Sequence, residues 1–156
     1  MKFDEIWESL LNYSTVHLAT VDNDQPRVRP MTLIIYEEQL WMVTHTEKNK
    51  VEELKKNTNI EFSFVFIKNK IVGCIRATGK GIIINDMSLK KELSENIAFF
   101  PNYWRTSDDP NYTLIQLKLD QVYYSPPTED GIKYLFDLTK GKDTYTEIPP
   151  YRLSDA

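Results

Sequence analysis

The stretch RVRPMTLIIYEEQLWMVTH, residues 27–45, contains two apolar runs separated by a short polar link. The runs cover residues 27–36 and 40–45, and a Glu-Glu-Gln link at residues 37–39 joins them. So short a link between two runs rich in Val, Ile, Thr and aromatic side chains is typical of a β-hairpin. The stretch therefore predicts two antiparallel strands that pair with each other.

Further strand patterns lie on both sides of this hairpin. They are VHLATVD (16–22), IEFSFVFI (60–67), IVGCIRATGKGIII (71–84), YTLIQLKL (112–119) followed by VYYS, and IKYLFDL (132–138). Gly79 and Gly81 interrupt the run 71–84, which predicts a bulge or bend of the kind that barrels use at their corners. Beyond residue 138 we expect a loose tail.

Helical patterns are expected only at residues 2–13, 47–56 and 87–96. Six or seven strands that arrive mainly as hairpins predict a mainly β fold, a closed or partly closed antiparallel barrel with peripheral helices. A Rossmann fold would need regular strand–helix alternation and a glycine fingerprint, and neither is present. No composition shift marks a domain boundary, so we expect a single domain.

Composition limits the classes of partner. The chain has 156 residues, is 41% hydrophobic and has a net charge of −4, which argues against nucleic acid or an anionic membrane as partner. Its one cysteine, Cys74, cannot form an internal disulfide, which favours a reducing compartment. The first 13 residues lack a signal-peptide cleavage site, and no apolar run approaches the roughly 20 residues of a membrane helix. We expect a soluble, cytoplasmic domain.

The start of the helix predicted at 47–56 carries an unusual charge pattern. Lys48 and Lys50 stand where helices ordinarily place Asp or Glu, because the helix N-terminus already has partial positive charge and unpaired N–H groups. Arg29, on the preceding strand pair, can be a neighbour of this segment. With the Thr44 hydroxyl and the Asn49 amide, these groups could bind a phosphate dianion. Alternatively, the lysines are solvated and Arg29 pairs with a glutamate.

The order of these features resembles one known family. ATVDNDQPRVRPMTLIIYEEQLWMVTHTEKNKVEELKKNTNIEFSF (19–64) and IRATGKG (75–81) look like the FMN-binding split β-barrels that include the pyridoxamine 5′-phosphate oxidases. FFPNYWRTSDDPNYTLIQLKLDQVYY (99–124) is similar to the branch of general stress and nitroimidazole-resistance proteins. The resemblance implies a six- to seven-stranded antiparallel split β-barrel. Residues 1–125 would form the FMN-binding domain and residues 126–156 a C-terminal extension of it.

The same resemblance implies which residues bind the cofactor. The FMN phosphate would be held by Arg29, Asn49 and Lys50, with Thr44 hydrogen-bonding nearby. The flavin ring edge would lie along the backbone of Pro30, Met31 and Thr32. Asn49 replaces a frequent arginine of the family, for which Lys48 would compensate. Cys74 stands where these oxidases often have a glutamine.

A flavin also needs a shielded slot for its flat ring. The aromatic candidates are Trp41, Phe99, Phe100, Tyr103 and Trp104. We assign Trp104 to the cofactor site, because it follows FFPNY in a loop, and Trp41 to the core. His45 follows the strand end and could face a ligand. The histidines and the cysteine have no spacing suited to a metal site, and no nucleophile–base pair indicates catalytic residues.

The resemblance implies a homodimer with the flavin at the subunit interface. We expect a flavoprotein oxidoreductase that passes electrons from a nicotinamide donor to a small organic acceptor, with nitro compounds as a concrete example. Vitamin B6 oxidation is not expected, because the tail 139–156 has Arg152 but no histidine for the Arg/His signature of the true oxidases. The alternatives are a flavin-binding stress protein or sensor without turnover, or the deazaflavin F420 or haem in place of FMN.

Overall fold

A computed structural model describes residues 2–12 and 15–150 of the chain. The helices and strands, in chain order, are α1 (Lys2–Asn12), β1 (Thr15–Asp22), β2 (Gln25–Thr32), β3 (Ile34–Tyr36), β4 (Gln39–His45), α2 (Asn49–Lys56), β5 (Asn59–Lys68), β6 (Ile71–Ile84), α3 (Met87–Asn96), β7 (Tyr112–Ser125), β8 (Lys133–Asp137) and β9 (Tyr145–Ile148). Within these residues the nine strands form one antiparallel sheet, so the predicted mainly β fold with peripheral helices is confirmed.

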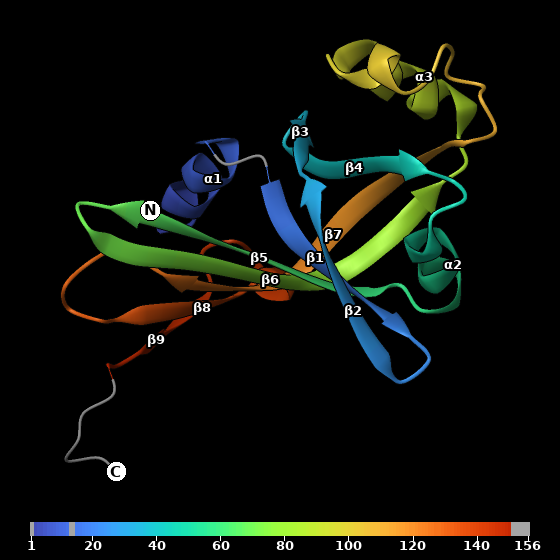
Figure 1. Cartoon of the computed structure of the whole chain (residues 1–156). Helices are drawn as coiled ribbons and strands as arrows, with labels where there is room; N and C mark the ends of the chain where they lie inside the picture. The colour runs from blue at the N-terminus through green and yellow to red at the C-terminus, as the bar shows by residue number, and fades with distance from the viewer. Residues whose placement is uncertain (1, 13–14, 151–156) are drawn as a thin grey trace.

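The sheet is rolled rather than flat. Its main path runs β2-β1-β5-β6-β7-β4-β3, while β8 pairs with β7 and with β9. The two end strands of this path, β2 and β3, are consecutive in the chain and are separated only by the buried residue Leu33. Because one residue joins the two ends of the path, the sheet must curl back on itself, and the β1–β2 hairpin crosses the long strands β5 to β7 (Figure 1).

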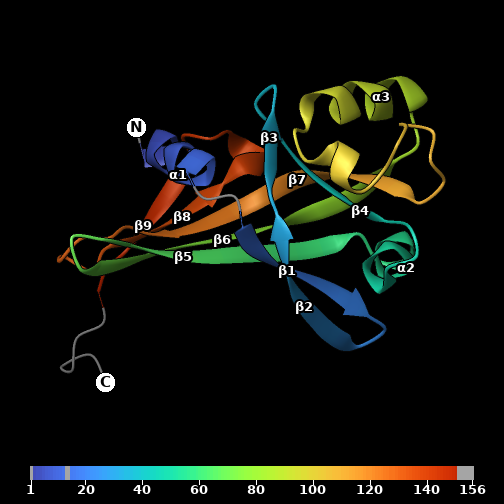
Figure 2. The same ribbon diagram turned by 45° about the horizontal axis from the view of Figure 1, so that its top comes forward.

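Two apolar cores lie on opposite sides of β4. Side chains alternate along a strand, so Leu40 and Met42 join the large core inside the rolled sheet, whereas Trp41 and Val43 join a smaller core with α3. Helix α1 covers the first core and α3 stands apart from it over β4 and β7 (Figure 2). The strand β4 therefore lies between the large core inside the rolled sheet and the smaller core beneath α3.

The expected hairpin at residues 27–45 is only partly correct. Residues 27–36 do not form one strand, because the strand is interrupted at Leu33, and β2 pairs with β1 rather than with β4. Only residues 34–36 pair with β4. The strand count in the described part of the chain is nine instead of six or seven, partly because β9 occupies the segment expected to be a loose tail.

The bulge predicted from Gly79 is present. The register between β6 and β7 shifts between Thr78 and Gly79, and there the backbone of β7 passes so close that a side chain at position 79 would be excluded. A Cβ at this position would lie 2.8 Å from the Cα of Leu119 and closer still to the carbonyl oxygen of Lys118. The glycine is therefore required by the approach of the two longest strands.

Replacing Gly79→Ala should lower the free energy of unfolding by about 2–3 kcal/mol, because backbone atoms must move to admit the methyl group. The control is Gly81→Ala in the same strand, whose Cβ would meet side-chain atoms of Ile60 and Leu54 at 3.2 Å. It should cost less than about 1 kcal/mol, since side chains can adjust. Urea unfolding of both variants measures the difference. Equal losses would contradict this account of the bulge.

Candidate functional site

Arg29 is held by a buried group of polar side chains. Its Nη1 donates to Thr20 Oγ1 at 2.7 Å and its Nη2 lies 3.0 Å from Glu53 Oε2. The Thr20 hydroxyl in turn donates to the same Glu53 oxygen at 2.7 Å. Since Thr20 is on β1, Arg29 on β2 and Glu53 on α2, these three side chains fix the helix against the β1–β2 hairpin.

Lys50 is a second buried cation near this group. Its side chain lies at the start of α2, only 9% of the residue is exposed, and its Nζ donates to Thr44 Oγ1 at 3.1 Å. Burial lowers the pKa of the Lys50 ammonium from its usual 10.5, and the positive charges of Arg29 and Lys48 lower it further, against the opposing effect of Glu53. The charged form of Lys50 is therefore destabilised by its burial and by the neighbouring cations.

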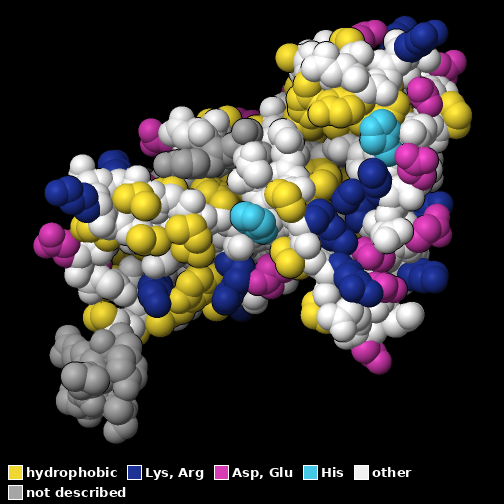
Figure 3. All heavy atoms as spheres, in the orientation of Figure 1, with side chains coloured by type: hydrophobic (Ala, Val, Ile, Leu, Met, Phe, Trp, Pro, Cys, Tyr) yellow, Lys and Arg dark blue, Asp and Glu magenta, His cyan; other side chains and the backbone are white. Residues whose placement is uncertain are grey.

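These side chains surround an open hollow of about 390 Å³. Its lining consists of Asp22, Arg27, Val28, Arg29, Lys48, Asn49, Lys50 and Glu53. We call Arg29, Lys48 and Lys50 the cationic corner. Dark-blue Lys and Arg side chains gather on this face, over β2 and α2 (Figure 3). At the rim, Arg27 and Asp22 neutralise each other across 3.3 Å, so the corner supplies the excess positive charge.

The helix N-terminus adds to this positive potential. Lys48 precedes α2 with an extended backbone, and its side chain makes no capping hydrogen bond. Asn49 is the first residue of the helix and lines the hollow. No side chain caps this end of the helix, although the Val51 N–H donates to the Lys48 carbonyl oxygen, and the helix dipole favours an anion there. Of the residues predicted from the sequence, Arg29, Asn49 and Lys50 thus share one hollow, and Thr44 contacts Lys50.

Pro30, Met31 and Thr32 follow Arg29 along β2 without lining the hollow. Pro30 and Thr32 are exposed and Met31 is half-buried. Because β2 is the end strand of the sheet path, one edge of its backbone lies outside the ladder with β1. An exposed edge of this kind can accept or donate hydrogen bonds to a bound molecule.

Trp104 lies away from the other predicted site residues. It is 4% exposed in the small core, its Nε1 donates to the carbonyl oxygen of Asn111 at 2.9 Å, and its ring packs against Phe100 and Tyr112. It does not line the hollow. Trp41, predicted to be a core residue, is 3% exposed in the same core.

His45 and Cys74 also lie outside the hollow. The His45 ring lies 4.9 Å from the Trp104 ring, and its Nδ1 is 3.0 Å from the side-chain amide of Asn111. Cys74 is half-buried, and burial raises the pKa of its thiol. It is therefore a poor nucleophile at neutral pH.

The sequence analysis allowed Arg29 a glutamate partner, which the structure confirms as Glu53, but it identified neither Glu53 nor Thr20, although a signal for each was present. Val16 and Leu18 mark the inward face of β1, and Thr20 continues that alternation. Val51 and Leu54 mark the inward face of α2, and Glu53 lies beside Leu54 on it, three residues after Lys50. A carboxylate and a hydroxyl on buried faces need partners, and the partner they share is Arg29.

In the described ranges 2–12 and 15–150, no helix is long and apolar enough to cross a membrane. Nor does this part of the chain gather three or more His, Cys, Asp or Glu side chains into a group that could hold a metal ion. The cationic corner is therefore the strongest candidate site, and its chemistry is suited to an anionic ligand.

The rolled antiparallel sheet with peripheral helices is shared with a known class of proteins. The family model described as "Pyridoxamine 5′-phosphate oxidase" matches residues 3–126. The chain belongs to the pyridoxamine 5′-phosphate oxidase family. None of the proteins with curated descriptions matches it significantly.

Solved structures share this fold at low sequence identity. General stress protein 26 from Bacillus anthracis is 24% identical with a TM-score of 0.66, covering 88% of this chain and 100% of that one. A NimC/NimA family protein from Clostridium acetobutylicum is 22% identical with a TM-score of 0.64, covering 94% and 90%. A FAD-binding protein from Mesorhizobium loti is 15% identical with a TM-score of 0.62, covering 76% and 87%. At these identities the likeness establishes the fold.

Replacing Lys50→Met should stabilise the protein by about 0.5–1 kcal/mol in phosphate-free buffer, because it removes a buried charge that the fold disfavours. A lowered pKa means that the folded chain holds this proton less tightly than the unfolded chain. The penalty from Lys50 is therefore present in full below its lowered folded-state pKa and is lost as the pH rises from there to 10.5, so the difference between the variant and the parent should shrink over that window.

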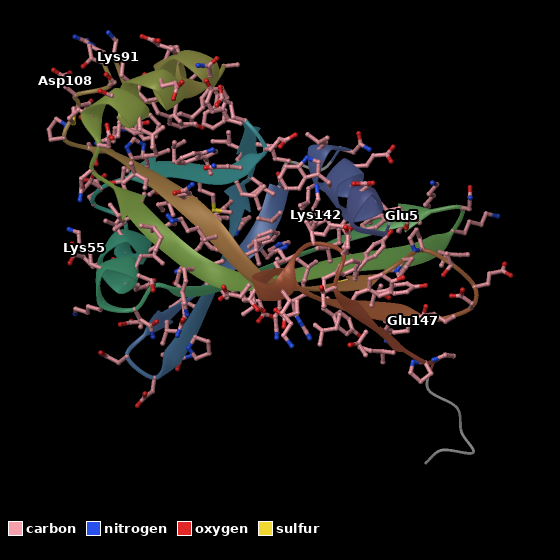
Figure 4. All side chains as sticks on the ribbon, turned by 180° about the vertical axis from the view of Figure 1, so that it is seen from behind. Glu5, Lys55, Lys91, Asp108, Lys142 and Glu147 are labelled. Carbon is pink, nitrogen blue, oxygen red and sulfur yellow. The ribbon has the colours of Figure 1, made fainter. Side chains whose placement is uncertain are left out.

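The control is Lys55→Met on the same helix. Lys55 points away from the molecule in Figure 4 and pairs with Glu52 at the surface, at 3.0 Å. Thermal unfolding of both variants at several pH values should show a gain only for Lys50→Met. A clear loss of stability in that variant would mean that Lys50 is part of the scaffold rather than of a ligand site.

Proposed function

We propose that this protein binds FMN with its phosphate in the cationic corner and acts as an oxidoreductase. The observation that carries the proposal is the buried position of Lys50 beside two other cations around one open hollow. Holding like charges together costs free energy, and an anion that binds among them recovers it. Residues of this kind, in a hollow at a helix N-terminus, are typical of a site for phosphate.

The residues present fit a phosphate monoester. Its oxygens accept hydrogen bonds only, and the corner offers a guanidinium and two ammonium groups, to which the hollow adds the Asn49 side-chain amide and the start of α2. Arg29, Asn49 and Lys50 would hold the phosphate, and Thr44 would orient Lys50 through the hydrogen bond it already accepts. The exposed edge of residues 30–32 would provide hydrogen bonds to the ring edge.

The family supports a flavin rather than another phosphate ester. The family model covers most of the chain, and one solved structure of the same fold is described as FAD-binding. A bound flavin would supply electron and hydride transfer, which no side chain can provide. The side chains would bind and orient the cofactor. We propose a nicotinamide donor and a small organic acceptor, and we place the protein in the cytoplasm.

We propose that two copies form the working unit, with the flavin at their interface. Val65, Ile67 and Val72 are 63%, 67% and 56% exposed on the hairpin of β5 and β6, where Ile67 pairs with Val72. Clustered apolar side chains on a surface often mark a protein–protein interface. A partner would also bring a second set of aromatic residues, which suits a site whose own Trp104 lies away from the hollow. Light scattering measures the mass in solution and tests this assembly.

Binding of FMN tests the site. Arg29→Ala and Lys50→Ala should each weaken FMN binding by about 1.5–3 kcal/mol, the contribution of a hydrogen bond to a charged group. Lys55→Ala, on the outer face of the same helix, should leave the affinity unchanged. Quenching of flavin fluorescence by the cofactor-free protein gives these affinities. If both corner variants bind FMN as tightly as the parent, the phosphate site is assigned to the wrong residues.

Turnover is tested on the FMN-loaded protein. NADH or NADPH added without oxygen should bleach the visible flavin absorbance, and air or a nitroaromatic acceptor should restore it. No bleaching with either donor would favour the alternative, a flavin-binding stress protein or sensor without turnover. Heat release and mass analysis of any chromophore in the purified protein would show whether F420 or haem takes the place of FMN.

A further inference from the structure

The guanidinium of Arg29 is largely occupied within the protein. Of its five N–H donors, one contacts the Thr20 hydroxyl, one the Glu53 carboxylate, and one, at a longer 3.4 Å, the carbonyl oxygen of Leu18. In the part of the chain that the structure describes, two donors remain for a ligand. Arg29 can thus offer two donors to an anion while it keeps its contact with Glu53.

Glu53 is unusual in lining a hollow that is otherwise suited to anions. Its residue is 7% exposed, and its Oε2 accepts hydrogen bonds from both Arg29 and Thr20. Because the Arg27–Asp22 pair at the rim is neutral in sum, the charge of the hollow depends on the corner and on Glu53. Three positive charges against one negative leave an excess of two. This excess equals the charge of one phosphate monoester dianion.

We propose that Glu53 is the built-in counter-anion of the cationic corner, which neutralises Arg29 and thereby lowers the affinity of the site for a phosphate dianion. This inference rests on the proposed function, since it concerns the regulation of affinity at the same site. Glu53 is a positioning residue. Through Arg29 it fixes the geometry of the corner, and through its charge it limits how tightly a dianion is held.

Glu53 stabilises the ligand-free site and at the same time limits its affinity for the ligand. Three cations without an internal anion would repel one another in the ligand-free state. Glu53 reduces this repulsion and holds the Arg29 guanidinium in place. Its negative charge also lowers the affinity of the corner for a phosphate dianion. A bound phosphate ester therefore remains exchangeable.

The first test is Glu53→Gln, which removes the charge and keeps an oxygen that accepts hydrogen bonds. The variant should bind FMN and inorganic phosphate about tenfold more tightly, with a steeper dependence on salt, as expected for one unit charge removed near the ligand. Riboflavin, which lacks the phosphate, should bind as it does to the parent. Glu52→Gln is the matched control, because Glu52 is an exposed neighbour paired with Lys55.

The second test asks whether removing Glu53 rescues the loss of Arg29. Arg29→Met alone leaves the carboxylate unpaired beside the ligand and should weaken FMN binding tenfold or more. The double variant Arg29→Met with Glu53→Met restores the excess of two positive charges and should bind FMN about tenfold more tightly than Arg29→Met alone, although the hydrogen bonds of Arg29 to the ligand stay lost. It also replaces the ion pair by apolar side chains of similar size, which folded proteins often tolerate. This variant keeps the test valid if Glu53→Gln does not fold.

The outcomes separate the two proposals. If the parent binds FMN but Glu53→Gln binds it no more tightly, or the double variant binds no better than Arg29→Met, the role of Glu53 is refuted while FMN binding stands. If FMN binds to no variant but inorganic phosphate binds more tightly to Glu53→Gln, the counter-anion role stands and the cofactor is wrong. Absence of both ligands from every variant would refute both.

Discussion

The arrangement of the site depends on the buried hydrogen bonds that link Arg29, Thr20 and Glu53. They join a strand, its neighbour and a helix, and nothing else in the described structure ties α2 to the β1–β2 hairpin through charged side chains. Each of the three groups would be costly to bury alone, so they hold the elements together as a set. The position of α2 sets in turn where Lys50 and the helix N-terminus lie.

A second constraint is the single residue between β2 and β3. Because Leu33 joins strands at opposite ends of the sheet path, the sheet must roll, and rolling brings Arg29 near the end of β4 and the start of α2. The bulge at Gly79 lets the two longest strands follow the same curvature. The hollow is therefore a consequence of the rolled sheet, with residues from β2 and α2 on its walls.

The sequence predicted the elements well where their signal was local. The helix at 87–96 and the strand at 71–84 were predicted to the residue, and the inward faces of α2 were marked by Val51 and Leu54. The gathering of Arg29, Asn49 and Lys50 was also predicted, although for an incorrect reason: β2 does not pair with β4. The partition of residues 27–36 into two strands was missed, because the break falls at Leu33, a buried apolar residue that gives no turn signal in the sequence.

What the sequence by itself determined is the class of fold and the character of the site. Side-chain periodicity and the excess of lysines at a helix start are local properties, readable along a few residues. Only the tertiary structure decided that Arg29 pairs with Glu53, that Lys50 is buried beside it, and that Trp104 belongs to a separate core under α3. These facts depend on which strands become neighbours when the sheet rolls, and pairing between distant segments is set by the packing of the whole chain.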